Sequence, residues 1–119
     1  MTVEAARVVQ IVFLKLSLPG RPERTAGVFL LEEATGKLSF RIRDDWDTIA
    51  DAADAEILSA VAEEFHNRLN EQGEGSGAEL LRSLEDQLSN VLRLSDRRQM
   101  TISNIGATLD LLFDQNCRN

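Results

Sequence analysis

The spacing of apolar residues changes once in this chain, near residue 44, and this change constrains the fold more than any other feature. Before it, the apolar runs are short, rich in Val, Ile and Phe, and separated by turn residues, which indicates strands. After the acidic sequence Asp44-Asp45-Trp46-Asp47, apolar residues recur every three or four positions, which indicates helices. Strands followed by helices are typical of an α+β domain.

The first half predicts an antiparallel meander. The expected strands cover residues 7–18, 27–33 and 37–43. The first is apolar on both faces, as in a strand that is covered on both sides. In the third, Leu38, Phe40 and Ile42 alternate with polar residues, as in a half-exposed strand. Because the connections at 19–26 and 34–36 are short, consecutive strands are expected to be neighbours in the sheet.

The second half predicts helices joined by a flexible linker. The expected helices run from Asp54 to about residue 71, onward from Ser76, and over about 104–114. Ser76 and Glu79 match a capping box. The sequence QGEGSG at 72–77 is the expected linker. The apolar stripe of the first helix consists of Ile57, Leu58, Val61, Phe65 and Leu69.

These patterns predict a single α+β domain over residues 1–119. It has a small antiparallel sheet of three or four strands, with two or three helices packed on one face. Residues 92–98 either continue a helix or form the fourth strand, and the alternation of Leu92 and Leu94 with Arg93 favours the strand. Residues 115–119 are expected to form a frayed tail.

Charge is distributed unevenly along the chain. The net charge is −7, yet residues 44–79 hold 11 acids and one base, Arg68, and the remaining 83 residues are net positive. This asymmetry favours a basic partner on one side, although a solvated helix face is the simpler explanation. An acidic chain is poorly suited to nucleic acid, whose binding depends on cations. We expect no signal peptide or membrane segment, and the single cysteine suits the reducing cytoplasm.

Two groups of charged residues are candidate sites. Asp44, Asp45 and Asp47 follow the third strand, where carboxylates can converge on a hard cation such as Mg²⁺. The alternative is that they end the strand and cap helices. Five arginines form a candidate anion site that grips phosphate or carboxylate, and the alternative is surface pairing with acids such as Glu32, Glu33, Glu85 or Asp86. These arginines are Arg41, Arg43, Arg93, Arg97 and Arg98.

A third candidate is a protein interface on the acidic segment. Its residues are Trp46, Glu56, Glu63 and Glu64. An exposed tryptophan can anchor an interface, but a tryptophan that closes the end of a core is the alternative. His66 is expected at the exposed boundary of its helix, without a nucleophile to activate. Cys117 is expected in the frayed tail, with nothing nearby in sequence to lower its pKa.

The segment Arg24–Leu38, RTAGVFLLEEATGKL, resembles the early part of a bacterial family of small proteins catalogued as a domain of unknown function (family 3037). Members of that family have a first strand, an arginine-bearing loop, a Gly-Val strand and a hairpin. The resemblance covers about the first third of the chain specifically and the rest in outline. It implies a bacterial origin and an α+β fold, and it implies no activity.

The leading hypothesis is a non-enzymatic, cytoplasmic protein-binding or accessory module without a cofactor, working through a protein partner or as a homodimer. The sequence contains no phosphate-binding glycine loop, nucleophile elbow or paired-cysteine motif. One alternative is a Mg²⁺- or Mn²⁺-dependent hydrolase or phosphoryl-transfer enzyme that uses the Asp44–Asp47 cluster. Another is a specific nucleic-acid or anion binder that uses the arginines.

Overall fold

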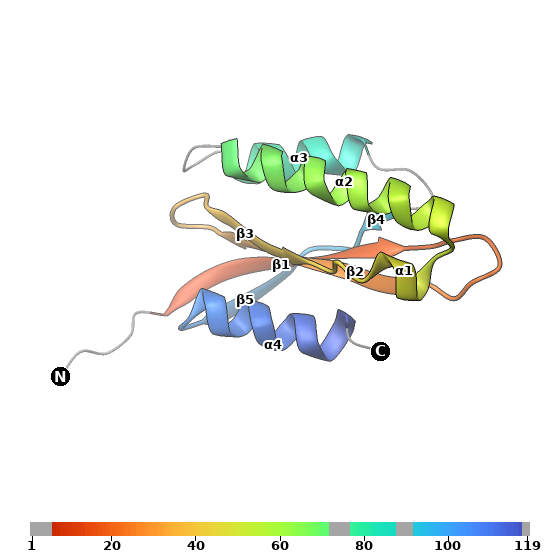
Figure 1. Ribbon diagram of the computed structural model, residues 1–119. Coiled ribbons are helices and arrows are strands. Elements are labelled where there is room, and N and C mark those ends of the chain that lie inside the picture. Colours follow the sequence, from red (N-terminus) through yellow and green to blue (C-terminus); the bar gives the residue numbers. More distant parts are fainter. Residues whose placement is uncertain (1–5, 72–76, 88–91, 118–119) are drawn as a thin grey trace.

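The computed structural model describes residues 6–71, 77–87 and 92–117, and these form an antiparallel sheet between two helical layers (Figure 1). The five strands are β1 (Arg7–Leu16), β2 (Arg24–Glu32), β3 (Leu38–Ile42), β4 (Leu92–Leu94) and β5 (Arg98–Ile102). The helices are α1 (Trp46–Ile49), α2 (Ala52–Glu71), α3 (Gly77–Gln87) and α4 (Ile105–Cys117). The α+β class and the meander of the first three strands are confirmed.

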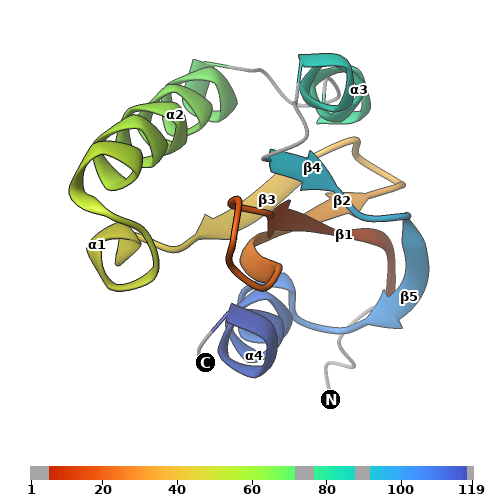
Figure 2. The same ribbon diagram turned by 90° about the vertical axis from the view of Figure 1, so that its right-hand side faces the viewer.

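Strand β1 is the centre of the sheet. It pairs with β2 on one side, and the strand order β3-β2-β1-β4 places β3 and β4 at opposite edges. On its other side β1 pairs with β4 near Leu16 and with β5 near Arg7. The expected fourth strand is therefore present as β4, and β5 is a further strand on the same edge (Figure 2).

Ser95 begins the connection between these two short edge strands. Its backbone N–H donates to the carbonyl oxygen of Phe13 at 2.8 Å, and its hydroxyl oxygen accepts from the N–H of Phe13 at 2.8 Å. The Ser95 hydroxyl thus replaces a backbone carbonyl oxygen as the acceptor for the N–H of Phe13. The chain passes from β4 to β5 while Phe13 keeps both of its backbone hydrogen bonds.

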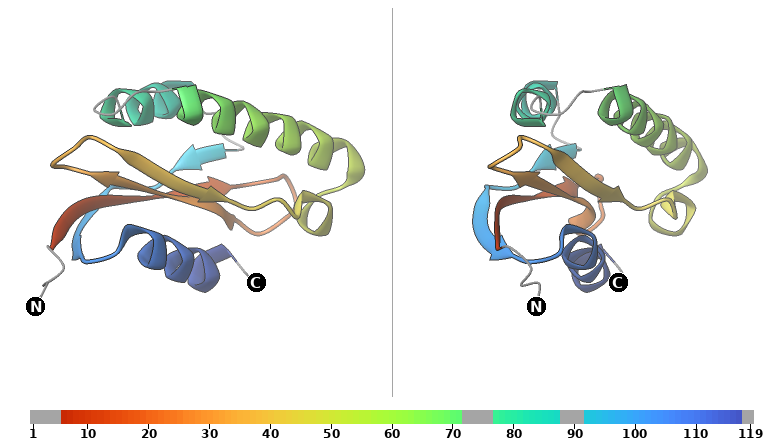
Figure 3. Two further views of the ribbon diagram at one scale, coloured as in Figure 1. Left: turned by 60° about the vertical axis from the view of Figure 1, so that its left-hand side comes forward. Right: turned by 90° about the vertical axis from the view of Figure 1, so that its left-hand side faces the viewer.

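Helices cover both faces of the sheet, which differs from the expectation of one covered face (Figure 3). Alternate residues of β1 and β2 point to opposite sides, and both sets are apolar. Val12, Leu14, Leu16, Phe29 and Leu31 form one core with α1, α2 and α3. Those on the other side pack against α4 in a second core, and they are Val9, Ile11, Val28 and Leu30.

Several predicted boundaries also shift. Strand β2 begins at Arg24 rather than at residue 27, within the expected loop. Asp51, not Asp54, caps α2, because its carboxylate accepts from the N–H of Asp54 at 2.9 Å. Residues 115–117 belong to α4 instead of a frayed tail, because the buried Cys117 packs in the second core.

The predicted linker and capping box lie only partly within the described residues. Residues 72–76, including Ser76, are outside them. Gly77 begins α3 and donates its N–H to the carbonyl of Gly36 at 2.9 Å, in the turn between β2 and β3. This contact joins the start of α3 to the turn and leaves no space for a side chain, since a Cβ on Gly77 would lie 2.3 Å from the oxygen of Gly36.

Candidate functional site

The outer face of α2 is acidic and unpaired within the described residues. Glu56, Glu63 and Glu64 are exposed, as expected for the predicted interface, and none forms an ion pair with any described residue. At about 3.6 residues per turn, Glu56 and Glu63 share one side of the helix because they are seven positions apart. We call Glu56, Glu63 and Glu64 the acidic face. It is available to cations from solution or from another protein.

An apolar groove lies beside the acidic face. It encloses about 470 Å³ between α2, the residues after β1, and β4. The groove is lined by Leu18, Pro19, Asp54, Ile57, Leu58, Val61 and Leu92. Among the described residues that line it, Asp54 alone is charged, so the groove favours an apolar group with positive charge nearby.

Ile57 is the residue of this groove that the sequence pattern misplaced. The helical spacing places it in the apolar stripe, yet it is 62% exposed, while Leu58 and Phe65 are buried. Successive helical residues are about 100° apart, so Ile57 lies on the flank of the face that contains Leu58. The angle between successive residues thus separates Ile57 from the buried face of α2, to which Ala62 belongs together with Leu58.

Trp46 is not part of an exposed interface. It is 5% exposed and packs with Ile49 in the core between the sheet and α2. The prediction of Trp46 as an interface anchor is therefore wrong, and the alternative, that it closes the end of the core, is confirmed. The short helix α1 explains its position, because this helix turns the chain from β3 toward α2 (Figure 1).

The three candidate metal ligands do not act together. Asp45 accepts two hydrogen bonds from Arg43, from Nε to Oδ1 and from Nη2 to Oδ2, both 2.8 Å long. These bonds hold the pKa of Asp45 down at about 2. Asp44 and Asp47 are exposed. In the described part of the chain, no group of three or more acidic, histidine or cysteine side chains is arranged to hold a metal ion.

The five candidate arginines lie on both edges of the sheet rather than in one cluster. Arg41 lies on β3 and Arg43 directly follows it, at one edge of the sheet. At the other edge, Arg93 lies on β4, Arg98 on β5, and Arg97 between these two strands. The predicted anion site with all five arginines is therefore wrong. Four of them bind acids: Arg41 binds Asp110 at 2.6 Å, Arg97 binds Glu85 at 3.0 Å, Arg93 binds Glu23, and Arg43 binds Asp45. The expected alternative of surface pairing is confirmed for Arg97 and Glu85.

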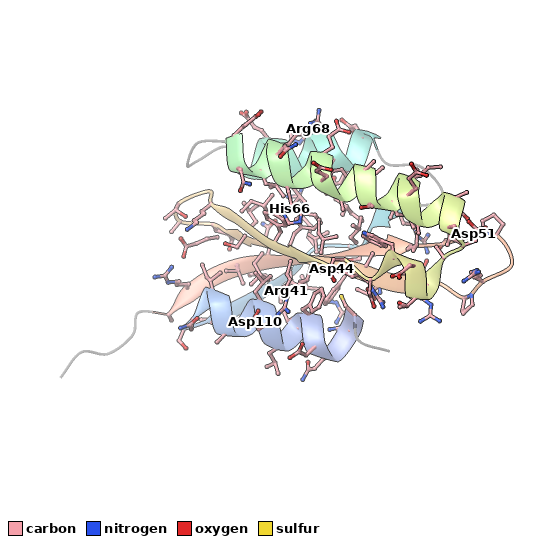
Figure 4. All side chains as sticks on the ribbon, viewed as in Figure 1. Arg41, Asp44, Asp51, His66, Arg68 and Asp110 are labelled. Carbon is pink, nitrogen blue, oxygen red and sulfur yellow. The ribbon has the colours of Figure 1, made fainter. Side chains whose placement is uncertain are left out.

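Arg41 on β3 and Arg43 directly after it have a structural role. Arg41 lies 4.3 Å from the centre of the Phe113 ring and reaches Asp110, so it holds α4 against the sheet. Figure 4 shows Arg41 and Asp110 together between β3 and α4. A cavity of about 330 Å³ beside them is lined partly by Arg43, Phe113 and Cys117. Both arginines that border it already have carboxylate partners.

His66 and Cys117 lie in different surroundings, one exposed beside an aromatic ring and the other buried. His66 is exposed, as expected, and its ring lies 4.8 Å from that of Phe40, on the side of α2 that faces the sheet (Figure 4). Burial raises the pKa of the Cys117 thiol to about 11. The thiol is therefore protonated at neutral pH and is a poor nucleophile.

Comparison with protein-family models, with curated proteins and with solved structures finds no match to this chain. The resemblance to family 3037 therefore stays a prediction. Within the described residues, no helix has both the length and the apolar character needed to cross a membrane.

Proposed function

We propose that the chain is a non-enzymatic protein-binding module that receives a basic segment of a partner protein on the acidic face of α2. The observation that carries this proposal is the absence of any ion-pair partner, among the described residues, for the carboxylates of Glu56, Glu63 and Glu64. Acids elsewhere in the fold, such as Glu23, Asp45 and Glu85, have arginine partners.

Charge favours a different protein over a second copy at this surface. Helix α2 carries five acidic residues and one arginine. Two such faces brought together would repel each other, whereas a segment rich in lysine or arginine would be attracted from a distance. Self-association through another surface stays compatible with this proposal, as does the expected cytoplasmic location.

Co-purification with charge-reversed variants tests the proposal. Wild-type protein and a double variant, Glu63→Lys with Glu64→Lys, serve as tagged baits in extracts of the native host at low and high salt. We expect a basic partner to bind the wild type at low salt, and to be lost both at high salt and from the variant.

The matched control reverses two exposed acids away from α2, with Asp86→Lys and Asp96→Lys, and so makes the same change in net charge. We expect this control to retain the partner. Equal loss from both double variants would show that only net charge matters, and would refute the acidic face as the contact.

A further inference from the structure

We infer that the groove beside the acidic face binds one large apolar side chain of the same partner segment, so that the module recognises a basic amphipathic sequence rather than positive charge alone. This inference rests on the proposed function and assigns a second, apolar element of recognition to it. The groove and the acidic face lie on the same helix, because Asp54, Ile57, Leu58 and Val61 all belong to α2.

The groove suits an apolar side chain in size and chemistry. Its volume of about 470 Å³ lies in the range of roughly 300–1,000 Å³ that is usual for ligand sites. Of the seven described residues that line it, six are apolar or proline. A small polar ligand would find few partners here, whereas an aliphatic or aromatic side chain would remove Ile57 and Val61 from water.

Charge complementarity identifies the rest of the segment. Asp54 lies in the groove lining, and Glu56 precedes Ile57 directly. Glu64 follows Ile57 by seven residues, and therefore lies on nearly the same side of α2, about 10 Å farther along its axis. A cation in the partner that reaches Glu64 must therefore lie about 10 Å from the apolar anchor.

This spacing predicts two sequence patterns for the partner. A distance of about 10 Å corresponds to roughly three residues of an extended chain. It corresponds to roughly seven residues of a helix. The partner segment is thus expected to carry lysine or arginine at one of these two distances from a leucine, isoleucine, methionine or phenylalanine.

The test is a titration of the isotope-labelled full chain with synthetic lysine peptides, followed by NMR. Each peptide has one leucine, with lysines spaced either three or seven residues from it, and matched peptides replace that leucine with alanine. We expect shifts at residues 54–64 and a Kd that weakens roughly tenfold or more without the leucine, from the apolar area no longer buried.

Two substitutions of exposed apolar residues complete the test. Ile57→Ser removes the apolar wall of the groove, and Leu111→Ser is its matched control, because Leu111 is 57% exposed on α4, across the sheet from α2. We expect Ile57→Ser to weaken the leucine peptide roughly tenfold, and Leu111→Ser to leave its Kd unchanged. Both residues are exposed, so both variants are expected to fold.

The outcomes separate the two proposals. If leucine and alanine peptides bind equally and Ile57→Ser has no effect, while reversal of Glu63 and Glu64 abolishes binding, the groove is refuted and the acidic face stands. If the leucine peptide binds with shifts remote from α2, or if no peptide binds at low salt, both proposals fail.

Discussion

Arg43 is a charged side chain placed almost entirely out of water, and Asp45, two residues later, supplies its counter-charge. The Arg43 side chain is 5% exposed, and within the described residues its Nε and Nη2 both donate to the Asp45 carboxylate. A buried guanidinium without such a partner would be costly. The pair therefore stabilises the end of β3 and depends on ionisation of Asp45.

This pair predicts a pH-dependent loss in Asp45→Asn. Because the folded-state pKa of Asp45 is lowered to about 2, its contribution is fully present above the unfolded pKa of about 4 and disappears as the pH falls toward about 2. Asp45 is 43% exposed, and solvent screening therefore limits the expected destabilisation at pH 7 to about 1–2 kcal/mol. Urea denaturation across this pH range measures it.

The control for this prediction is Asp44→Asn, at the exposed neighbouring position without an ion-pair partner among the described residues. We expect it to unfold at nearly the wild-type urea concentration at each pH. A loss for Asp45→Asn that stays constant down to about pH 2 would contradict the role given to the ionised carboxylate.

At the level of elements, two helical glycines make opposite predictions. A Cβ on Gly77 would lie 2.3 Å from the carbonyl oxygen of Gly36, while a Cβ on Gly106 would meet nothing closer than 3.5 Å. Alanine favours helices over glycine by about 1 kcal/mol. We expect Gly77→Ala nevertheless to destabilise by about 1–3 kcal/mol through this clash, and Gly106→Ala to stabilise by about 0.5 kcal/mol. Thermal unfolding of both variants measures these changes in stability. Stabilisation by Gly77→Ala would contradict the close docking of α3.

The sequence allowed the elements to be predicted because their signals are local. Short runs rich in Val, Ile and Phe between turn residues predicted β1 and β2, alternation predicted β3, and helical spacing predicted α2 and α4. The prediction that helices cover only one face of the sheet was wrong, and the strand residues themselves argue against it. The second face carries apolar side chains, which also have to be buried: Val9, Ile11, Val28 and Leu30. A strand that is apolar on both sides implies helices on both sides.

The candidate sites were harder to predict because they depend on contacts between distant residues. The local sequence pattern does not indicate which strands form the two edges of the sheet. It therefore could not show that Arg41 and Arg93 lie at opposite edges. Trp46 is flanked by aspartates, which suggested exposure, but its ring packs in the core. The carboxylates of the acidic face were predicted correctly as exposed, because helical geometry alone places them opposite Leu58.

For the whole molecule, the two cores share β1 and β2 and are expected to unfold together. Phe113 belongs to the core under α4, whereas Trp46, the chain's single tryptophan, reports on the core on the other side. We expect Phe113→Ala to destabilise by about 3 kcal/mol. The midpoints of Trp46 fluorescence and of far-ultraviolet circular dichroism should shift together in urea.

A fluorescence midpoint that stays at the wild-type value, while the dichroism midpoint falls, would show that α4 unfolds separately. The conservative variant Phe113→Leu is the control, since it keeps most of the apolar contact and loses the ring beneath Arg41. It should move both signals in the same direction by a smaller amount.

The burial of Cys117 makes its thiol a probe of local opening in the native protein. It is the chain's only thiol, and it lies between α4 and the sheet. Because Cys117 is 2% exposed at the last residue of α4, a thiol reagent can alkylate it only after this end of the helix opens from the sheet. The rate of alkylation therefore reports how readily this opening occurs under native conditions. The wild-type chain, without any substitution, thus reports how readily this end of α4 leaves the second core.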